Sequence, residues 1–269
     1  MRPPVDHSPP AGSVSISPLP ILLTVKAAHE DEGCVKGVAF GVADMRSEPK
    51  FRSERISQLV YGEEVRVLGS KDGYYRAKGR DRYEGYIQKS LVDDLDGDRA
   101  FKLAGRHQAD GILFPFGSYL SEKDARRFEV PRKLLVPVHR TADPVALSKR
   151  FLGVPYLWGG TSDFGYDCSG FTQRLFRYSC IELPRNADWQ RDAGETVDGF
   201  DAARRGDLVF FTGHVAIYLG DRRIIHANLS HGGVSVTDLS DGSAYSRRLH
   251  GILEGIRRFD GNDFARVRP

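Results

Sequence analysis

Short alternations of apolar and polar residues dominate the chain from about residue 36 to residue 93. They occur in VAFGVAD, ISQLV, EVRVLG, YYRAKG and YEGYIQ. Turn-forming residues separate these runs roughly every ten positions, which is the pattern of several short antiparallel strands. The alternation therefore predicts a small all-β barrel over residues 36–94.

The next segment, residues 95–140, has a weaker pattern. GILFPFGSYL and KLLVPV read as strands, and the charged stretch SEKDARRFEV separates them. We interpret 95–140 as a second, abbreviated barrel-like unit. Ahead of both units, residues 1–35 are rich in proline and serine and read as a flexible tail.

From residue 141 the period changes to that of helices. Asp143 is a suitable N-cap, Pro144 suits the first helical position, and Gly153 suits the end. Further on, DCSGFTQRLFRY places Phe171, Leu175 and Tyr178 on one face of a helix. We therefore place a domain boundary near residue 140 and treat residues 141–269 as one further domain.

The composition narrows the possible partners and the compartment. The formal net charge is +3 with basic and acidic residues interspersed, so no basic block indicates nucleic acid. The three cysteines are widely spread, which favours a reduced compartment over a disulfide framework. The run Ile21 to Val25 is too short for a signal-peptide core, and no run reaches membrane-spanning length. We expect a cytoplasmic protein with no membrane partner.

Cys168 is the candidate nucleophile. Asp167 would cap the helix, so Cys168 would lie in the first turn, where unpaired N–H groups and the helix dipole favour a thiolate. The charge of Asp167 opposes this, so a cationic partner would be needed. The alternative is a buried structural cysteine. The Gly, Asp and Ser neighbours argue against it, because a merely buried thiol does not require them.

Two histidines in a predicted hairpin are candidates for the base and its orienting group. HVAIYLG and RIIHAN are apolar strands joined by a Gly-Asp-Arg turn. A two-residue loop would pair His226 with Ile217 and leave His214 on the opposite face. A three-residue loop, or a bulge, would pair His226 with Ala216 and put both imidazoles on one face.

Other uses of these residues remain open on the residues alone. A histidine in an apolar strand can be a satisfied core residue. Zinc could use one cysteine and two histidines, although a fourth ligand is not evident.

Six motifs in order resemble the NlpC-type cysteine peptidases of bacterial cell-wall metabolism: PYLWGG, DCSGF, LPRNADWQ, RGDLVFF, GHVAIYLG and IIHAN. The resemblance covers about residues 143–258 and implies a papain-like α+β core. It also implies cleavage of the γ-D-glutamyl–diaminopimelate bond of murein peptides. The barrel segment in turn resembles a bacterial SH3-like domain, in ADMRSEP, YGEEVRVLGSKDGYYRAK and YEGYIQKSLV.

The resemblance implies roles for individual residues. Cys168 would be the nucleophile, His214 the base and His226 the orienting residue, with no metal or cofactor. Tyr156 and the Cys168 backbone N–H would hold the oxyanion. Two further positions that match substrate contacts in the family are Asp167 and Ser169. After LPR the chain has NADWQ, where the family often has Asp-Ala-Ser or a similar sequence.

Together the two resemblances point to the subgroup of γ-D-glutamyl-L-diamino-acid endopeptidases that act on small recycled peptides. In that subgroup the barrel grips the free amine of an N-terminal L-Ala. Glu48 and Tyr83 match that role by position, although both could be ordinary turn and strand residues. The third substrate residue stays open between diaminopimelate and lysine, and the oligomeric state is likewise open. The alternatives are an exported hydrolase of intact wall with barrels as anchors, an acyltransferase or amidase on the same core, and a non-catalytic SH3-like binding protein.

Overall fold

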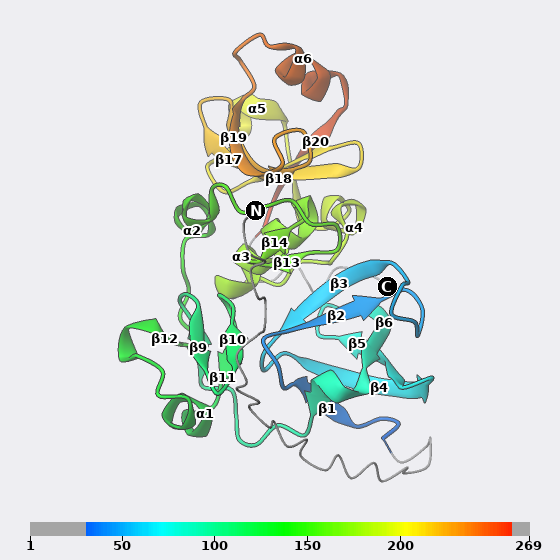
Figure 1. The fold of residues 1–269 in the computed structure, drawn as a ribbon. Helices are drawn as coiled ribbons and strands as arrows, with labels where there is room; N and C mark the ends of the chain where they lie inside the picture. The colour runs from blue at the N-terminus through cyan, green and yellow to red at the C-terminus, as the bar shows by residue number, and fades with distance from the viewer. Residues whose placement is uncertain (1–30, 260–269) are drawn as a thin grey trace, which may run out of the picture.

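The computed structural model describes residues 31–259, which form three successive units (Figure 1). Most of the expected tail lies outside the described residues. Its last position, Val35, already belongs to the first strand, so the folded part begins slightly earlier than expected. No helix among residues 31–259 is long and apolar enough to cross a membrane.

The first unit is the predicted barrel. Its seven strands form one antiparallel sheet in the order β3-β2-β6-β5-β4-β1-β7. A 3-10 turn, η1 (Lys89–Leu91), precedes the last strand. The strands are β1 (Val35–Val38), β2 (Val42–Arg46), β3 (Arg55–Val60), β4 (Glu64–Lys71), β5 (Tyr74–Gly79), β6 (Glu84–Gln88) and β7 (Val92–Asp93). Each of the strand patterns expected between 36 and 93 overlaps at least one of these strands.

The second unit holds two small sheets and one helix. Its elements are β8 (Phe101–Leu103), β9 (His107–Ala109), β10 (Ile112–Phe114), β11 (Tyr119–Leu120), α1 (Glu122–Arg127), η2 (Arg132–Leu134) and β12 (Leu135–Pro137). The charged stretch between the expected strands is helical at α1, because Ser121 and Asp124 form a reciprocal capping box. Tyr61 of the barrel packs into the core of this unit beside Phe114 and Phe128. The kinship of residues 95–140 to SH3 barrels stays a prediction.

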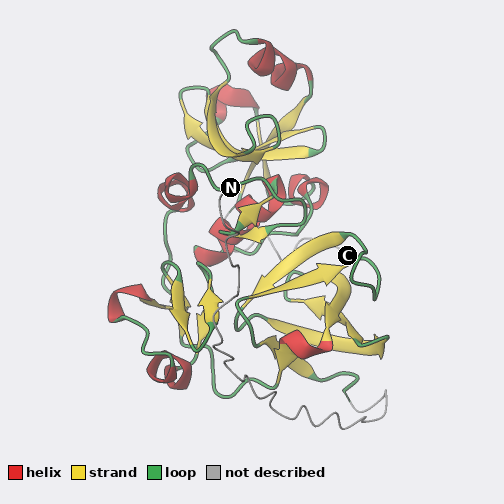
Figure 2. Ribbon diagram, viewed as in Figure 1, coloured by secondary structure: helices red, strands yellow, loops and turns green. Residues whose placement is uncertain are grey.

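The third unit is built on a six-stranded sheet in the order β15-β20-β16-β17-β18-β19. Figure 2 shows this sheet at one end of the molecule with helices around it, and the barrel at the other end. Its strands are β15 (Glu195–Val197), β16 (Leu208–Phe211), β17 (His214–Gly220), β18 (Arg223–Asn228), β19 (Gly233–Asp238) and β20 (Leu253–Arg258), with a separate hairpin of β13 (Thr161–Ser162) and β14 (Gly165–Tyr166). Its helices are α2 (Pro144–Ser148), α3 (Cys168–Tyr178), α4 (Ala187–Arg191), α5 (Gly199–Ala202) and α6 (Ala244–Gly251), with η3 (Lys149–Phe151) after α2. The α+β prediction for this unit is confirmed.

Helix α3 lies between the sheet and the barrel, at the centre of the molecule (Figure 1). The predicted face of Phe171, Leu175 and Tyr178 packs into the core of the third unit. The opposite side is buried as well, so all eleven residues of α3 are buried, including Arg174 and Arg177. The expected helix with one apolar face is in fact enclosed on every side, because the barrel covers its polar face.

Candidate active site

Cys168 is the first residue of α3, as predicted, and only 8% of its surface is exposed. The Asp167 side chain caps the helix by accepting from the Gly170 N–H at 2.7 Å. Gly170 lies so close to the Gly160 carbonyl that a Cβ there would come within 2.1 Å of the oxygen. The glycines around the cysteine therefore let the loop and the helix start pack against each other.

A buried ion pair holds this helix start. Arg185 donates from Nη1 and Nη2 to the two carboxylate oxygens of Asp167, at 3.0 and 2.5 Å. It also donates to the hydroxyl of Ser169 at 3.0 Å and, from Nε, to the hydroxyl of Ser57 in the barrel at 3.0 Å. Arg185 is thus the cationic partner that the charge of Asp167 requires. This arginine belongs to the LPR motif, but the motif alone does not indicate its contact with Asp167.

The side chains of Asp167 and Ser169 are therefore both engaged in hydrogen bonds within the protein. The Asp167 carboxylate accepts from Gly159, Gly170 and Arg185, and Ser169 accepts from Arg185. The structure places both residues beside Cys168. Their role in binding substrate stays a prediction.

The thiol of Cys168 is protonated at neutral pH. Burial raises its pKa to about 11, and the negative charge of Asp167 adds to this. Hydrogen bonds from the backbone N–H groups of Val215 and Ser169, and the charge of Arg185, act in the opposite direction but do not prevail. The expected thiolate is therefore wrong for the free protein, because desolvation at this depth outweighs the helix start.

The two histidines lie on one face of the predicted hairpin. Asp221 and Arg222 both have positive φ, and a bulge between Tyr218 and Gly220 shifts the register, so Ile217 pairs with Ile225. The bulge puts His214 Nε2 at 2.7 Å from His226 Nδ1. The register that a joint site requires is confirmed. His214 also directly precedes Val215, whose N–H contacts the cysteine.

Only one arrangement of protons on the His214 and His226 rings lets His214 act as a base. His226 Nε2 lies 3.0 Å from the Thr237 hydroxyl, so both of its ring nitrogens are engaged. If His214 Nδ1 is to accept a proton, Nε2 must donate to His226 Nδ1, and His226 Nε2 must then donate to Thr237. Burial lowers the pKa of His214 to about 4, and burial together with the neighbouring His214 and His231 holds the pKa of His226 well below its ordinary value. Both rings are therefore neutral at pH 7.

Thr237 was not identified from the sequence. The His226 partner on β19 is Ser235, and Thr237 lies two residues beyond it on the same face. The sequence signal that could have identified Thr237 is the alternation of side-chain faces along β19. Within residues 31–259, no three His, Cys, Asp or Glu side chains are grouped so as to hold a metal ion.

Tyr156 lies beside the reactive sulfur. Burial raises its pKa to about 12, and the charges of Cys168 and Asp167 add to this effect. Its hydroxyl is therefore a neutral donor across the physiological range. The backbone of Tyr156 is fixed by its N–H, which donates to the Gly232 carbonyl at 2.9 Å.

Two exposed tryptophans of the catalytic domain contact residues of the barrel. Trp158 is 62% exposed, yet its indole N–H donates to Glu54 at 2.7 Å. Trp189 meets the ring of Tyr83 edge-on, with 5.7 Å between the ring centroids. The structure therefore brings Tyr83 to the catalytic domain, as the sequence suggested.

Glu48 is a different case. Its side chain is 58% exposed and pairs with Lys50 at 2.7 Å in the turn between β2 and β3. None of its described contacts reaches the third unit. Glu54, at the end of the same turn, does reach the third unit, where its carboxylate accepts from the Trp158 indole N–H.

A cysteine at the start of a central helix, next to a histidine on the adjoining sheet, is the arrangement of a papain-like cysteine peptidase. Comparison with known families agrees with this class. Residues 153–254 match the NlpC/P60 family, and residues 41–93 match the bacterial SH3 domain. The chain therefore carries an NlpC/P60 cysteine-peptidase domain behind a bacterial SH3 domain.

Individual relatives are named as peptidases. A γ-D-glutamyl-L-lysine dipeptidyl-peptidase of Bacillus cereus is 37% identical over 139 residues, which are 48% of this chain and 41% of that protein. The chain thus spans about two fifths of that relative. Dipeptidyl-peptidase 6 of Lysinibacillus sphaericus is 26% identical over 74% of this chain and 90% of its own. A crystal structure of an NlpC/P60 family protein from Bacillus cereus shares the fold with a TM-score of 0.69, at 19% identity, over 84% of this chain and 99% of its own.

Proposed function

We propose that the protein is a cysteine endopeptidase that hydrolyses the bond between γ-D-glutamate and the following diamino acid in small murein peptides. The observation that carries the proposal is that Cys168 accepts a hydrogen bond from the N–H of Val215, the residue after His214, and that side-chain contacts run from His214 through His226 to Thr237. The names of the relatives support the substrate class. A role in cytoplasmic recycling of wall peptides is part of the same proposal.

The mechanism follows from the protonation states. Cys168 Sγ attacks the γ-glutamyl carbonyl carbon while His214 Nδ1 takes the thiol proton. The Tyr156 hydroxyl and the Cys168 backbone N–H stabilise the oxyanion. His214 then gives its proton to the departing amine, and a water molecule, deprotonated by His214, releases the acyl group from sulfur. His226 and Thr237 hold the His214 ring in the tautomer that leaves Nδ1 free to accept.

Product analysis on matched substrates tests the proposal. The protein is incubated with L-Ala-γ-D-Glu-diaminopimelate, its lysine counterpart, the N-acetylated peptides and intact sacculi, and the products are identified by mass spectrometry. We expect L-Ala-γ-D-Glu and the free diamino acid from the small peptides. Release of fragments from sacculi at an equal rate would favour the exported wall hydrolase, and no cleavage at all would favour a non-catalytic binding protein.

The pH profile should reflect the buried histidine. His214 must be unprotonated to accept the thiol proton, and burial lowers its pKa to about 4. We therefore expect kcat/KM to stay nearly constant from pH 7 to about pH 5 and to fall as the pH drops through about 4. Circular dichroism at each pH separates this loss from unfolding. An acid limb near pH 6.5, the ordinary histidine value, would contradict the buried neutral pair.

The barrel should confer a preference for a free N-terminal amine. Glu54 presents its carboxylate beside Trp158 at the site wall, and Tyr83 lies against Trp189. An ammonium group there would gain a charge-assisted hydrogen bond, and acetylation would remove it. Because such a bond contributes about 1.5–3 kcal/mol, we expect acetylation to lower kcat/KM by roughly ten- to a hundredfold.

Two matched variants test which carboxylate is involved. Glu54→Gln should reduce the preference for the free amine and leave kcat on saturating substrate nearly unchanged. Glu48→Gln should leave the preference intact, because Lys50 already pairs with Glu48. The reverse result would return the role to Glu48.

A further inference from the structure

One strand of the barrel, β3, lies against the loop that leads to Cys168, beside the hairpin of β13 and β14 (Figure 1). Two of its residues contact this loop directly. Gly159 has a φ of +73°, and a Cβ there would come within 2.4 Å of the Arg55 carbonyl oxygen. Gln58 accepts from the Thr161 hydroxyl on its backbone carbonyl at 2.8 Å, and from the Thr161 N–H on its side chain at 3.3 Å. The barrel therefore fixes the backbone of this loop.

A third residue of β3, Ser57, reaches the start of α3 through Arg185. Ser57 is buried, and its hydroxyl is the acceptor that the described part of the chain supplies to Arg185 Nε, at 3.0 Å. Both Nη atoms of the same guanidinium donate to the carboxylate of Asp167. Because a guanidinium group is planar and rigid, the contact at Nε sets the direction of the two Nη donors. Ser57 thus orients the arginine that holds Asp167.

Asp167 joins the two sides of the proposed oxyanion site. Its Oδ2 accepts from the Gly159 N–H at 2.9 Å, and its Oδ1 accepts from the Gly170 N–H at 2.7 Å. Gly159 belongs to the same loop as Tyr156, and Gly170 lies in the first turn of α3, two residues after Cys168. A displaced Asp167 carboxylate would therefore change the position of the Tyr156 hydroxyl relative to the Cys168 N–H.

We propose that Ser57 is a positioning residue of the barrel, acting through Arg185 on the two oxyanion donors of the catalytic domain. The inference rests on the proposed mechanism, which assigns those two donors to the oxyanion. Stabilisation of an oxyanion depends on donors that are already in place, so their displacement raises the energy of the transition state more than that of the bound substrate. The barrel is then a part of the catalytic machinery as well as a wall beside the substrate.

Steady-state kinetics on the full-length protein gives the first test. Ser57→Ala leaves the buried Nε–H of Arg185 without its acceptor. We expect kcat on L-Ala-γ-D-Glu-diaminopimelate to fall about tenfold with KM nearly unchanged, a smaller loss than the roughly hundredfold that follows removal of a whole oxyanion donor. Ser57→Thr keeps the hydroxyl and should restore most of kcat, whereas the isosteric Ser57→Val should not. The control is Ser118→Ala, which removes a buried hydroxyl of the second unit and should leave kcat and KM unchanged.

Two small reagents separate the oxyanion donors from the reactivity of the thiol, and neither requires a murein peptide. Acylation of Cys168 by p-nitrophenyl acetate passes through an oxyanion as the sulfur displaces p-nitrophenolate, whereas alkylation by iodoacetamide forms no oxyanion. Acylation is measured as the p-nitrophenolate released in excess of the matching Cys168→Ala protein, and alkylation is measured by peptide mapping of Cys168. In Ser57→Ala we expect acylation to slow about tenfold and alkylation to change by less than about twofold.

Unchanged acylation in Ser57→Ala, equal losses of acylation and alkylation, or equal activity of Ser57→Val and Ser57→Thr overturns the positioning role. If circular dichroism shows that Ser57→Ala does not fold, Thr161→Val takes its place, because it removes the hydroxyl that donates to Gln58 on the same strand. A wild-type protein that is acylated at Cys168 but cleaves no murein peptide would overturn the proposed substrate and leave this test in force. Acylation that does not depend on Cys168 would overturn both proposals.

Discussion

Replacing Cys168 by alanine is expected to lower the hydrolysis of L-Ala-γ-D-Glu-diaminopimelate by about 10⁴- to 10⁶-fold. The sulfur of Cys168 is the atom that forms the acyl intermediate. Among the described contacts of His214, none is with another cysteine. The change removes one small buried atom, so the fold should survive with a cost of about 1 kcal/mol. Steady-state kinetics, with circular dichroism as the folding control, measures both quantities.

The matched control is Cys34→Ala, since Cys34 is an exposed cysteine in the barrel. It should leave kcat/KM unchanged. Substantial turnover by Cys168→Ala would contradict the covalent mechanism and indicate another nucleophile. Inhibition by a chelator that zinc reverses would instead restore the metal alternative.

Sequence patterns were most informative where the determining contacts are local. Asp167 caps α3, and Asp143 caps α2, because the capping side chain and the N–H that it binds are only two or three residues apart. The hairpin was also predictable, but its register was not. The left-handed conformations of Asp221 and Arg222 allow a two-residue turn, and only the bulge before Gly220 brings His214 and His226 to one face.

Contacts between distant segments could not be predicted in the same way. Arg185 meets Ser57 across 128 residues, and Glu63 meets Arg174 across 111. The local pattern of either segment does not identify its partner. A charged residue is expected to be exposed to solvent, because the local sequence does not show that another part of the fold buries it. The same limit explains Glu48 and Glu54, which lie in one turn between β2 and β3 but face different surroundings. The expected thiolate at Cys168 was wrong for a related reason, because the depth of burial depends on the whole fold.

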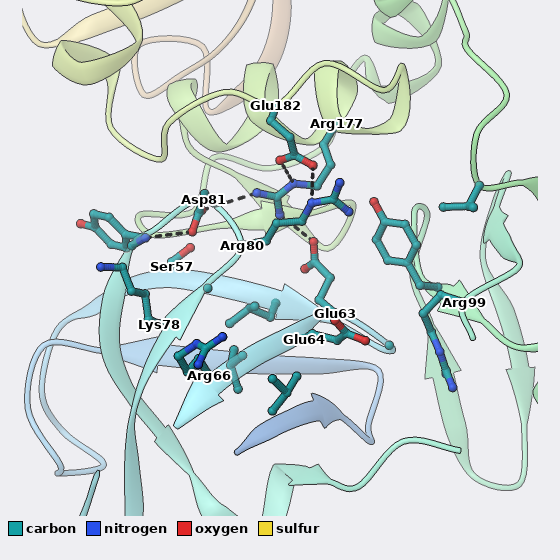
Figure 3. A pocket seen from close by; sticks show the side chains of 18 of the residues that line it. Ser57, Glu63, Glu64, Arg66, Lys78, Arg80, Asp81, Arg99, Arg177 and Glu182 are labelled. Atoms are coloured by element: carbon teal, nitrogen blue, oxygen red, sulfur yellow. Dashed lines mark hydrogen bonds and ion pairs between the residues drawn. The ribbon is translucent and has the colours of Figure 1, made fainter. Parts of the chain in front are cut away.

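Glu63→Gln is expected to destabilise the protein by about 3–5 kcal/mol, the usual cost of removing one partner from a buried ion pair. Glu63 accepts from Arg174 at 3.0 Å and from Arg177 at 2.7 Å, and all three side chains are buried. Figure 3 shows the pair of Glu63 and Arg177. The variant would leave the buried guanidinium of Arg174 without its carboxylate partner, while Arg177 would keep Glu182. Thermal unfolding should then begin about 10 °C lower. Glu64→Gln, at the exposed neighbouring position, should change the stability by less than about 0.5 kcal/mol.

The same ion pairs should make the wild-type protein sensitive to acid in a defined range. Burial alone would raise the pKa of Glu63, but the charges of Arg174 and Arg177 outweigh it and bring the pKa to about 2, against 4.5 for an ordinary glutamate. A lowered pKa in the folded state means that the carboxylate stabilises the fold fully above about pH 4.5. This contribution, about 3 kcal/mol, is lost as the pH falls from 4.5 toward 2. Urea unfolding at successive pH values should show the loss in wild type and a much smaller one in Glu63→Gln. Equal slopes in the two proteins would mean that other carboxylates govern the acid unfolding, and that the contact between barrel and catalytic helix does not depend on this charge.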